Sequence, residues 1–116
     1  MGDFEPINYK RGFLQLIILS LLSQKDMYGY QLVQETAKQS AGKYITQEGS
    51  LYPILYKLLE GGFITSYEQY ATSRLRHIYY HLEEKGFLYL EFLQKQFDEV
   101  IQGIRLILKE DIQENE

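Results

Sequence analysis

The 116-residue chain contains no cysteine and no tryptophan, and only two prolines. The absence of cysteine excludes disulfide bonds, thiolate zinc sites and a cysteine nucleophile. The sequence also lacks a long hydrophobic run, because its longest predominantly apolar stretch, 13–22, is about half the length of a membrane-spanning helix. No small-residue cleavage site follows that stretch, so we expect no signal peptide, no membrane partner and a cytoplasmic protein.

An excess of positive charge is missing as well. Twelve basic and 16 acidic residues give a net charge of −4, which by itself argues against a nucleic-acid partner. The charge is unevenly distributed, however, since residues 1–90 carry nine acids and nine bases, and residues 91–116 carry seven acids and three bases. Because charges act over a Debye length of about 10 Å, the neutral first part can still present a locally basic surface.

Two segments show the apolar periodicity of a helix that is buried on one side. Their apolar residues are Leu14, Ile17, Ile18, Leu21 and Leu22 in the first, and Leu51, Ile54, Leu55, Leu58 and Leu59 in the second. They predict one helix over about 8–23 and another that begins near Gly49 or Ser50. The Gly61-Gly62 pair ends the latter helix, because glycine accepts the left-handed conformation found at helix ends.

A further helix is predicted between these two, over about 28–39. Tyr30, Val33 and Ala37 are spaced for one face, and Asp26 is a candidate N-cap. After Gly62 the pattern changes to β-branched and aromatic residues at 63–67 and 77–81. These two segments predict a β-hairpin with its loop near 69–75.

The last segment returns to a helical pattern, with apolar residues alternating at spacings of three and four. They are Leu90, Leu93, Phe97, Val100, Ile104 and Ile107. Such a heptad pattern is typical of a helix that packs against a second chain. It therefore predicts a homodimer, although the same residues could pack on their own domain.

Three helices, a hairpin and a long helix are the element order of a winged helix-turn-helix fold with a C-terminal dimerisation helix. The predicted fold class is mainly α with a small β component (α+β). We expect a DNA-binding domain over 1–82 and a dimerisation helix with an acidic tail over 83–116.

Several motifs resemble the PadR family of bacterial transcriptional regulators. They are Gly12-Phe13-Leu14, then Tyr-Gly-Tyr-Gln-Leu at 28–32, Gly-Ser-Leu-Tyr-Pro-Ile-Leu at 49–55, Leu-Leu-Glu-Gly-Gly-Phe-Ile at 58–64, and the segment 76–86. The resemblance implies a homodimeric, ligand-responsive repressor that binds a pseudo-palindromic operator in double-stranded DNA. The chain departs from the family pattern at Glu83, where threonine is frequent, and in a wing tip that is poorer in glycine and arginine. It resembles the short members with a single C-terminal helix.

Candidate DNA-binding residues lie in the third helix, in the hairpin and before the first helix. They are Thr46, Gln47, Ser50, Tyr52, Tyr56 and Lys57; Arg74, Arg76 and His77; and Lys10 and Arg11. Short polar side chains on a helix can contact base edges in the major groove, and arginine suits phosphate. The alternative is that these residues form ordinary solvated faces, and for Tyr52 that it packs inside the protein.

An effector site is a further expectation from the resemblance, because family members receive planar aromatic effectors. The candidate residues are Tyr9, Phe13, Phe92 and Phe97, which would line a space between the first and last helices of a dimer. The alternative is an aromatic core without a cavity.

Catalytic and metal-binding motifs are absent from the sequence, and we expect neither an enzyme nor a cofactor. His77 and His81 would lie on one face of a strand but roughly 13 Å apart, too far to share an ion. A second function class remains open: a winged-helix module that binds proteins and not DNA. It would be favoured if Lys57, Arg74 and Arg76 were scattered or paired with acids.

Overall fold

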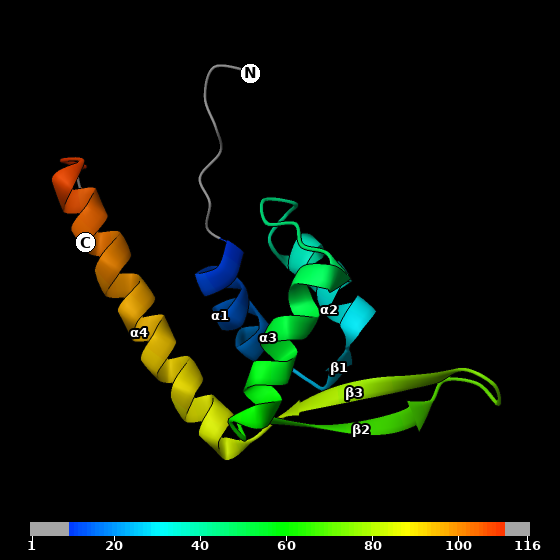
Figure 1. The fold of residues 1–116 in the computed structure, drawn as a ribbon. Coiled ribbons are helices and arrows are strands. Elements are labelled where there is room, and N and C mark those ends of the chain that lie inside the picture. The colour runs from blue at the N-terminus through cyan, green and yellow to red at the C-terminus, as the bar shows by residue number, and fades with distance from the viewer. Residues whose placement is uncertain (1–9, 111–116) are drawn as a thin grey trace.

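The computed structural model describes residues 10–110, without the side chains of Lys10 and Arg11. The helices are α1 (Lys10–Leu22), α2 (Gly29–Gln39), α3 (Glu48–Glu60) and α4 (Glu84–Ile107). The strands are β1 (Met27–Tyr28), β2 (Ile64–Tyr70) and β3 (Arg76–Leu82). Figure 1 shows α1 to α3 clustered above the hairpin, and α4 extending away from them. The predicted order of elements is confirmed, with β1 as an addition. No helix within residues 10–110 is both long and apolar enough to cross a bilayer.

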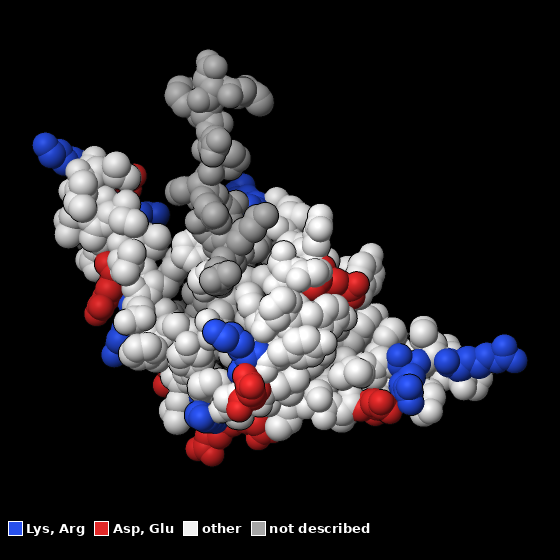
Figure 2. Space-filling view, in the orientation of Figure 1, with Lys and Arg blue, Asp and Glu red and all other residues white. Residues whose placement is uncertain are grey.

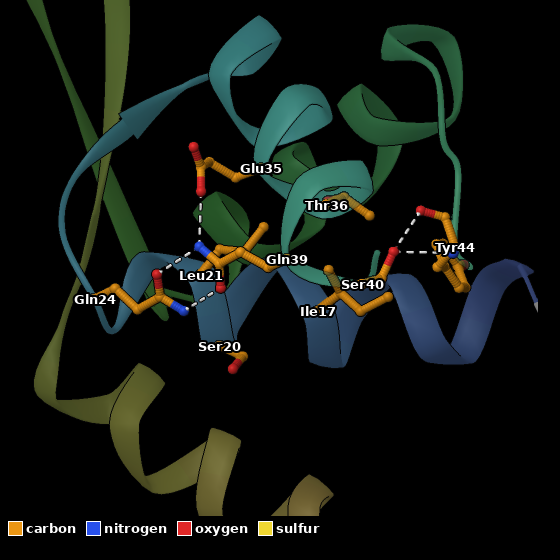
Figure 3. A pocket seen from close by; sticks show the side chains of 9 residues that line it. All are labelled: Ile17, Ser20, Leu21, Gln24, Glu35, Thr36, Gln39, Ser40 and Tyr44. Carbon is orange, nitrogen blue, oxygen red and sulfur yellow. Dashed lines mark hydrogen bonds between the residues drawn. The ribbon is translucent and has the colours of Figure 1, made fainter. Parts of the chain in front are cut away.

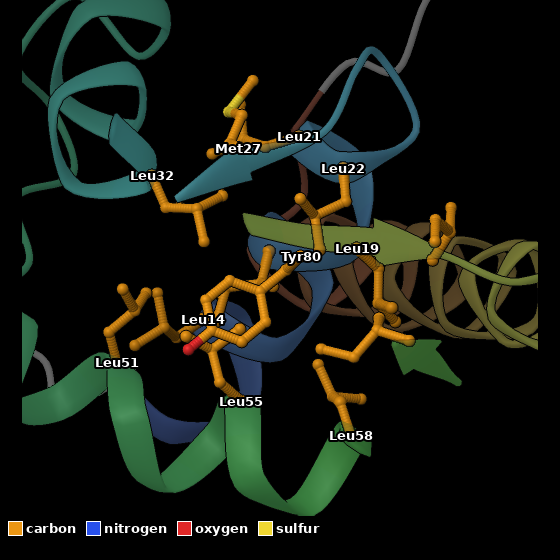
Figure 4. Close-up of a cluster of buried hydrophobic side chains, with 13 residues drawn as sticks. Leu14, Leu19, Leu21, Leu22, Met27, Leu32, Leu51, Leu55, Leu58 and Tyr80 are labelled. Atoms are coloured by element: carbon orange, nitrogen blue, oxygen red, sulfur yellow. The ribbon is translucent and has the colours of Figure 1, made fainter. Parts of the chain in front are cut away.

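The core forms where α1, α3 and the sheet meet (Figure 4). Both predicted apolar stripes point into it, and Tyr80 of β3 is buried between them with 4% of its surface exposed. The buried hydrophobic residues are Leu14, Ile18, Leu19, Leu21, Leu22, Met27, Leu32, Leu51, Leu55, Leu58, Ile64, Tyr80 and Leu82. The periodicity of α1 and α3 therefore predicted the faces that these helices bury.

Helix α2 buries only part of the predicted face, since Val33 packs against the core and Ala37 is half-buried, but Tyr30 is not. Gly29, Leu32 and Thr36 are buried, whereas Tyr30 is 53% exposed. The prediction was wrong for Tyr30, and it did not include the buried Leu32 and Thr36. Small residues let α2 approach its neighbours, and the Thr36 hydroxyl is satisfied by donating to the Leu32 carbonyl at 2.7 Å.

The start of α2 also differs from the prediction. Tyr28 occupies the N-cap position in an extended conformation, because it belongs to β1 and pairs with Tyr79 of β3. The side-chain oxygen of Gln31 accepts a hydrogen bond from the Tyr28 backbone N–H at 3.4 Å. Asp26 is therefore not the N-cap, and its carboxylate contacts the hairpin instead.

The sheet is antiparallel with the strand order β1-β3-β2. The hairpin strands are longer than predicted, since Gln69 and Tyr70 pair with His77 and Arg76. The connecting turn is closed by a hydrogen bond of 2.7 Å from the Ala71 N–H to the Leu75 carbonyl. The wing is thus an extended hairpin with a short tip.

Helix α3 ends where the glycine pair predicts. Gly62 has a φ of +77°, and the Phe63 N–H donates to the Leu58 carbonyl while the Gly62 N–H donates to Leu59. This hydrogen-bond pattern is the Schellman motif, which satisfies the last carbonyls of a helix. At the other end the helix begins at Glu48, one residue before the predicted start, and Pro53 lies in its second turn.

The first half of α4 belongs to the body of the domain. Leu90 and Leu93 are partly buried against the core, and Tyr89 accepts a hydrogen bond of 3.0 Å from the Gln15 side chain of α1. Glu83 occupies the N-cap position without capping the helix, since its carboxylate accepts a hydrogen bond of 2.7 Å from the Thr65 hydroxyl. The Glu83 side chain therefore joins the start of α4 to β2 and not to the first turn of the helix.

Gly86 allows α4 to enter against the hairpin. A Cβ atom at this position would clash with the Phe63 carbonyl oxygen and the Leu82 side chain. We therefore expect Gly86→Ala to destabilise the protein by about 1–3 kcal/mol, the usual cost of overpacking. Gly49→Ala, also in a first helical turn but with nothing within 4 Å of its Cβ, should be neutral or stabilising by up to about 1 kcal/mol. Urea unfolding of both variants checks this; equal stabilities would contradict it.

Candidate nucleic-acid interface

The exposed face of α3 lies opposite its buried stripe. Leu51, Leu55 and Leu58 point inward, which turns the remaining side chains to the solvent. Of the predicted DNA-contacting residues, Gln47, Ser50, Tyr56 and Lys57 are exposed, and Thr46 is half-buried. Tyr56 is 63% exposed. The packing that builds the core thus presents the N-terminal end and outer face of α3.

Tyr52 is half-buried and packs against the core. A Cβ built on Gly29 would lie 2.5 Å from its hydroxyl oxygen, so α2 and α3 approach closely only because residue 29 is glycine. Burial first, and then the neighbouring Glu48 carboxylate, raise the pKa of Tyr52. Its hydroxyl lies 3.5 Å from the Glu48 carboxylate as donor. Tyr52 therefore sets the spacing of the two helices.

A groove runs between α3 and the hairpin. It has a volume of about 640 Å³, and its lining includes Tyr30 of α2, Tyr56 of α3, and Ser66, Arg76 and Ile78 of the hairpin. Figure 1 shows the hairpin projecting sideways from the lower end of α3. The groove brings residues of α2, α3 and the wing onto one surface.

The wing carries its positive charge near its tip (Figure 2). Arg76 donates to Glu68 in an ion pair of 3.3 Å, with side chains 53% and 55% exposed. Such exposed pairs contribute about 0–1 kcal/mol, so phosphate can replace the carboxylate. Arg74 is exposed, and no acid in the described part of the chain lies within ion-pair distance of it. His77 stacks on Tyr28, with ring centroids 3.9 Å apart.

Lys57 is separate from these arginines. It lines a different hollow, together with Gln15, Pro53, Ile54 and Tyr89. The structure therefore does not gather all the predicted basic residues at one place. Tyr9 lies outside the described residues, as do the side chains of Lys10 and Arg11.

The wing is fixed to the body by a cluster that sequence reasoning missed. Asp26, in the turn after α1, accepts a hydrogen bond of 2.7 Å from the Tyr67 hydroxyl and lies 2.8 Å from Nδ1 of His81. These contacts join one turn to both hairpin strands. No local pattern reveals them, because the partners are 41 and 55 residues away in sequence.

The electrostatics of this anchor follow from its geometry. Burial raises the pKa of Asp26, but the hydrogen bonds from Tyr67 and His81 and the charge on His81 outweigh it and lower the pKa below 3.8. The hydrogen bond to Asp26 is the main cause that raises the pKa of Tyr67 to about 12. Within the described residues, no group of three or more His, Asp or Glu side chains is placed to hold a metal ion.

The three predicted effector residues that the structure describes, Phe13, Phe92 and Phe97, do not form one cluster. Phe13 and Phe97 meet edge to face with centroids 5.5 Å apart. Phe92 lies on another side of α4, where it stacks on Tyr89 at 6.4 Å.

Three helices followed by a β-hairpin against which α3 packs define a winged helix-turn-helix protein. Residues 18–91 match the model of the transcriptional regulator PadR-like family. Protein X of Lysinibacillus sphaericus is 31% identical over 99 residues, which are 85% of this chain and 91% of that protein. The chain belongs to the PadR-like family of transcriptional regulators.

Solved structures agree with this assignment. A transcriptional regulator from Clostridium thermocellum matches with a TM-score of 0.77 and 27% identity, over 86% of this chain and 96% of that one. PadR of Bacillus subtilis, solved in complex with operator DNA, matches with a TM-score of 0.63 and 26% identity. The match with it covers 68% of this chain and 46% of that one.

The anchor at Asp26 should make wing attachment depend on pH. Because its pKa is lowered in the folded protein, its stabilising contribution is complete above about pH 4 and is lost as the pH falls through the folded-state pKa. We expect Asp26→Asn to cost about 1 kcal/mol at pH 7 and much less at pH 3. Urea unfolding at both values measures this, with Asp98→Asn on α4 as the control. A cost that does not change between pH 7 and pH 3 would contradict the account.

Proposed function

We propose that this protein is a sequence-specific DNA-binding regulator that represses transcription as a homodimer in the cytoplasm. The observation that carries the proposal is the joint exposure of the outer face of α3 and the arginines of the wing on a PadR-like fold. The similarity to Bacillus subtilis PadR, solved with operator DNA, supports it. Residues 1–82 would then bind DNA, and 83–116 would hold the dimer.

In this proposal α3 enters the major groove of a pseudo-palindromic operator. Thr46, Gln47 and Ser50 are at the N-terminal end of α3, where recognition helices contact base edges. Tyr56 lies further along, Tyr52 contributes by positioning, and Lys57 binds flanking phosphate. Arg74, Arg76 and His77 hold the backbone from the wing, and Lys10 and Arg11 approach it from the start of α1.

Dimerisation would use the second half of α4. Along one stripe of this helix the side chains change from partly buried at Leu90 and Leu93 to exposed at Val100, Ile104 and Ile107. Ile107 is 79% exposed. An apolar row of this kind is covered most simply by the same row of a second copy.

An aromatic effector would bind at this dimer interface. The Phe13–Phe97 pair lies between α1 and α4, and Tyr9 and Phe92 would close the site with residues of both subunits. Binding there would shift α4 against α1, and so change the separation of the two α3 helices.

A second function, protein binding without DNA, keeps some support. Arg76 is paired with Glu68, and Lys57 lies in a hollow apart from the wing. In that case the tyrosine-rich groove between α3 and the hairpin would receive a protein partner.

DNA binding can be tested by gel shift on the DNA upstream of the gene. We expect a specific complex at moderate salt, which Lys57→Ala and Arg74→Ala weaken on all sequences while each reduces the salt slope by about 1. The control Lys95→Ala on α4 should bind as the wild type does. Absence of any specific fragment would favour the protein-binding function, and equal binding by all variants would contradict the phosphate contacts assigned to Lys57 and Arg74.

The dimer can be tested with two variants on opposite sides of α4. Ile104 is 47% exposed on the proposed interface, and Leu106 is 64% exposed on the other side. Ile104→Glu should give monomers in sedimentation analysis, because it places a charge in an apolar interface, while Leu106→Glu should remain dimeric. A monomeric wild type, or dissociation by Leu106→Glu alone, would contradict the proposed interface.

A further inference from the structure

A pocket between α1 and α2 lies outside the surfaces assigned to DNA and to dimerisation (Figure 3). Its volume is about 190 Å³. Residues of α1, of α2 and of the loop before α3 line it; they are Ile17, Ser20, Leu21, Gln24, Glu35, Thr36, Gln39, Ser40 and Tyr44. It thus touches three segments of the chain at once.

One wall of the pocket is held by a network of side chains. Gln24 and Gln39 exchange hydrogen bonds of 2.8 and 2.9 Å through their amides. The Gln39 amide nitrogen also donates to one carboxylate oxygen of Glu35 at 2.7 Å. Both hydrogens of that amide are therefore in use, and Gln39 has no further donor to offer.

Glu35 places a negative charge at the edge of the pocket. Among the described residues, nothing donates to its second carboxylate oxygen, and no lysine, arginine or histidine forms an ion pair with it. The residue is half-buried. A cationic donor that reached this oxygen would gain a charge-assisted hydrogen bond.

The rest of the lining favours an apolar group of limited size. Leu21 is buried and Ile17 partly buried, and the Thr36 hydroxyl is committed to the Leu32 carbonyl. An apolar cavity of about 150 Å³ accepts one benzene molecule, so 190 Å³ holds one ring with a short substituent.

We infer that this pocket binds a small primary amine carried on an apolar group of about one ring, with the ammonium at Glu35. The class is set by the Glu35 carboxylate on one wall and the apolar residues beside it.

Because of where the pocket lies, an amine bound in it would change the affinity of the protein for DNA. Gln24 is two residues before Asp26, whose carboxylate holds both strands of the wing. At the other end Ser40 accepts a hydrogen bond of 3.0 Å from the Tyr44 N–H, in the loop that leads to α3. An amine that moved α1 against α2 would displace both DNA-contacting elements and weaken binding. This coupling, unlike the binding itself, rests on the proposed function.

The test of binding uses the full chain without DNA. Benzylamine and benzyl alcohol, which match in shape and differ in charge, are titrated while backbone amide shifts are followed by NMR. We expect shifts centred on 17–24 and 35–44, and binding of the amine about tenfold tighter than of the alcohol. Glu35→Gln should abolish this preference, and Glu91→Gln on α4, which removes the same charge, should retain it.

A second variant tests the pocket itself. Ser20 is exposed at its edge, so Ser20→Phe should fold and should lose both compounds. Equal affinities for amine and alcohol in the wild type, preference retained in Glu35→Gln, or shifts elsewhere on the surface would overturn the inference.

The coupling is tested by adding saturating benzylamine to the gel shift. Wild-type affinity for the operator should fall several-fold, and that of Glu35→Gln should not change. Binding of benzylamine without any change in DNA affinity would overturn the coupling. If no fragment were bound specifically with or without the amine, the proposed function would fail, whereas the titration without DNA would still decide the amine site.

Discussion

The packing of α1 against α3 around Tyr80 is the constraint on which the other features depend. Each helix has one apolar stripe, and each buries it against the other and against β3. Because Leu51, Leu55 and Leu58 are buried on the inner face of α3, this packing determines which residues of α3 face the solvent. The exposure of the N-terminal end and outer face of α3 therefore follows from the core packing. The position at which the hairpin leaves the core follows from it as well.

A second constraint joins the wing to this core. Hydrogen bonds of the sheet place β3 between β1 and β2, and Asp26 adds two side-chain contacts from the turn after α1. The wing would otherwise be a two-stranded hairpin, which is marginally stable alone. Its arginines are thus carried at a defined distance from α3, which a DNA-binding role requires.

Sequence reasoning predicted the elements whose faces are set by repeated apolar residues, and was wrong where single contacts decide. It identified the stripes of α1 and α3 and the glycine end of α3. For α2 it chose Tyr30, which is exposed, and missed Thr36, because a polar residue gives no apolar signal even when packing buries it. It misassigned Asp26, since partners 41 and 55 residues away leave no local pattern. It treated the whole α4 heptad as one dimer interface. In the structure the N-terminal part of this stripe packs on its own domain, and the stripe becomes exposed only from Val100 onward.

The central claim is that two α3 helices of a dimer occupy successive major grooves of the operator. Hydroxyl-radical and base-methylation footprinting of the wild-type protein on its upstream DNA tests this most directly. The account predicts two protected major-groove patches on one face of the duplex, centred about 10 base pairs or a multiple of that apart. A single patch, or uniform protection along the fragment, would contradict it.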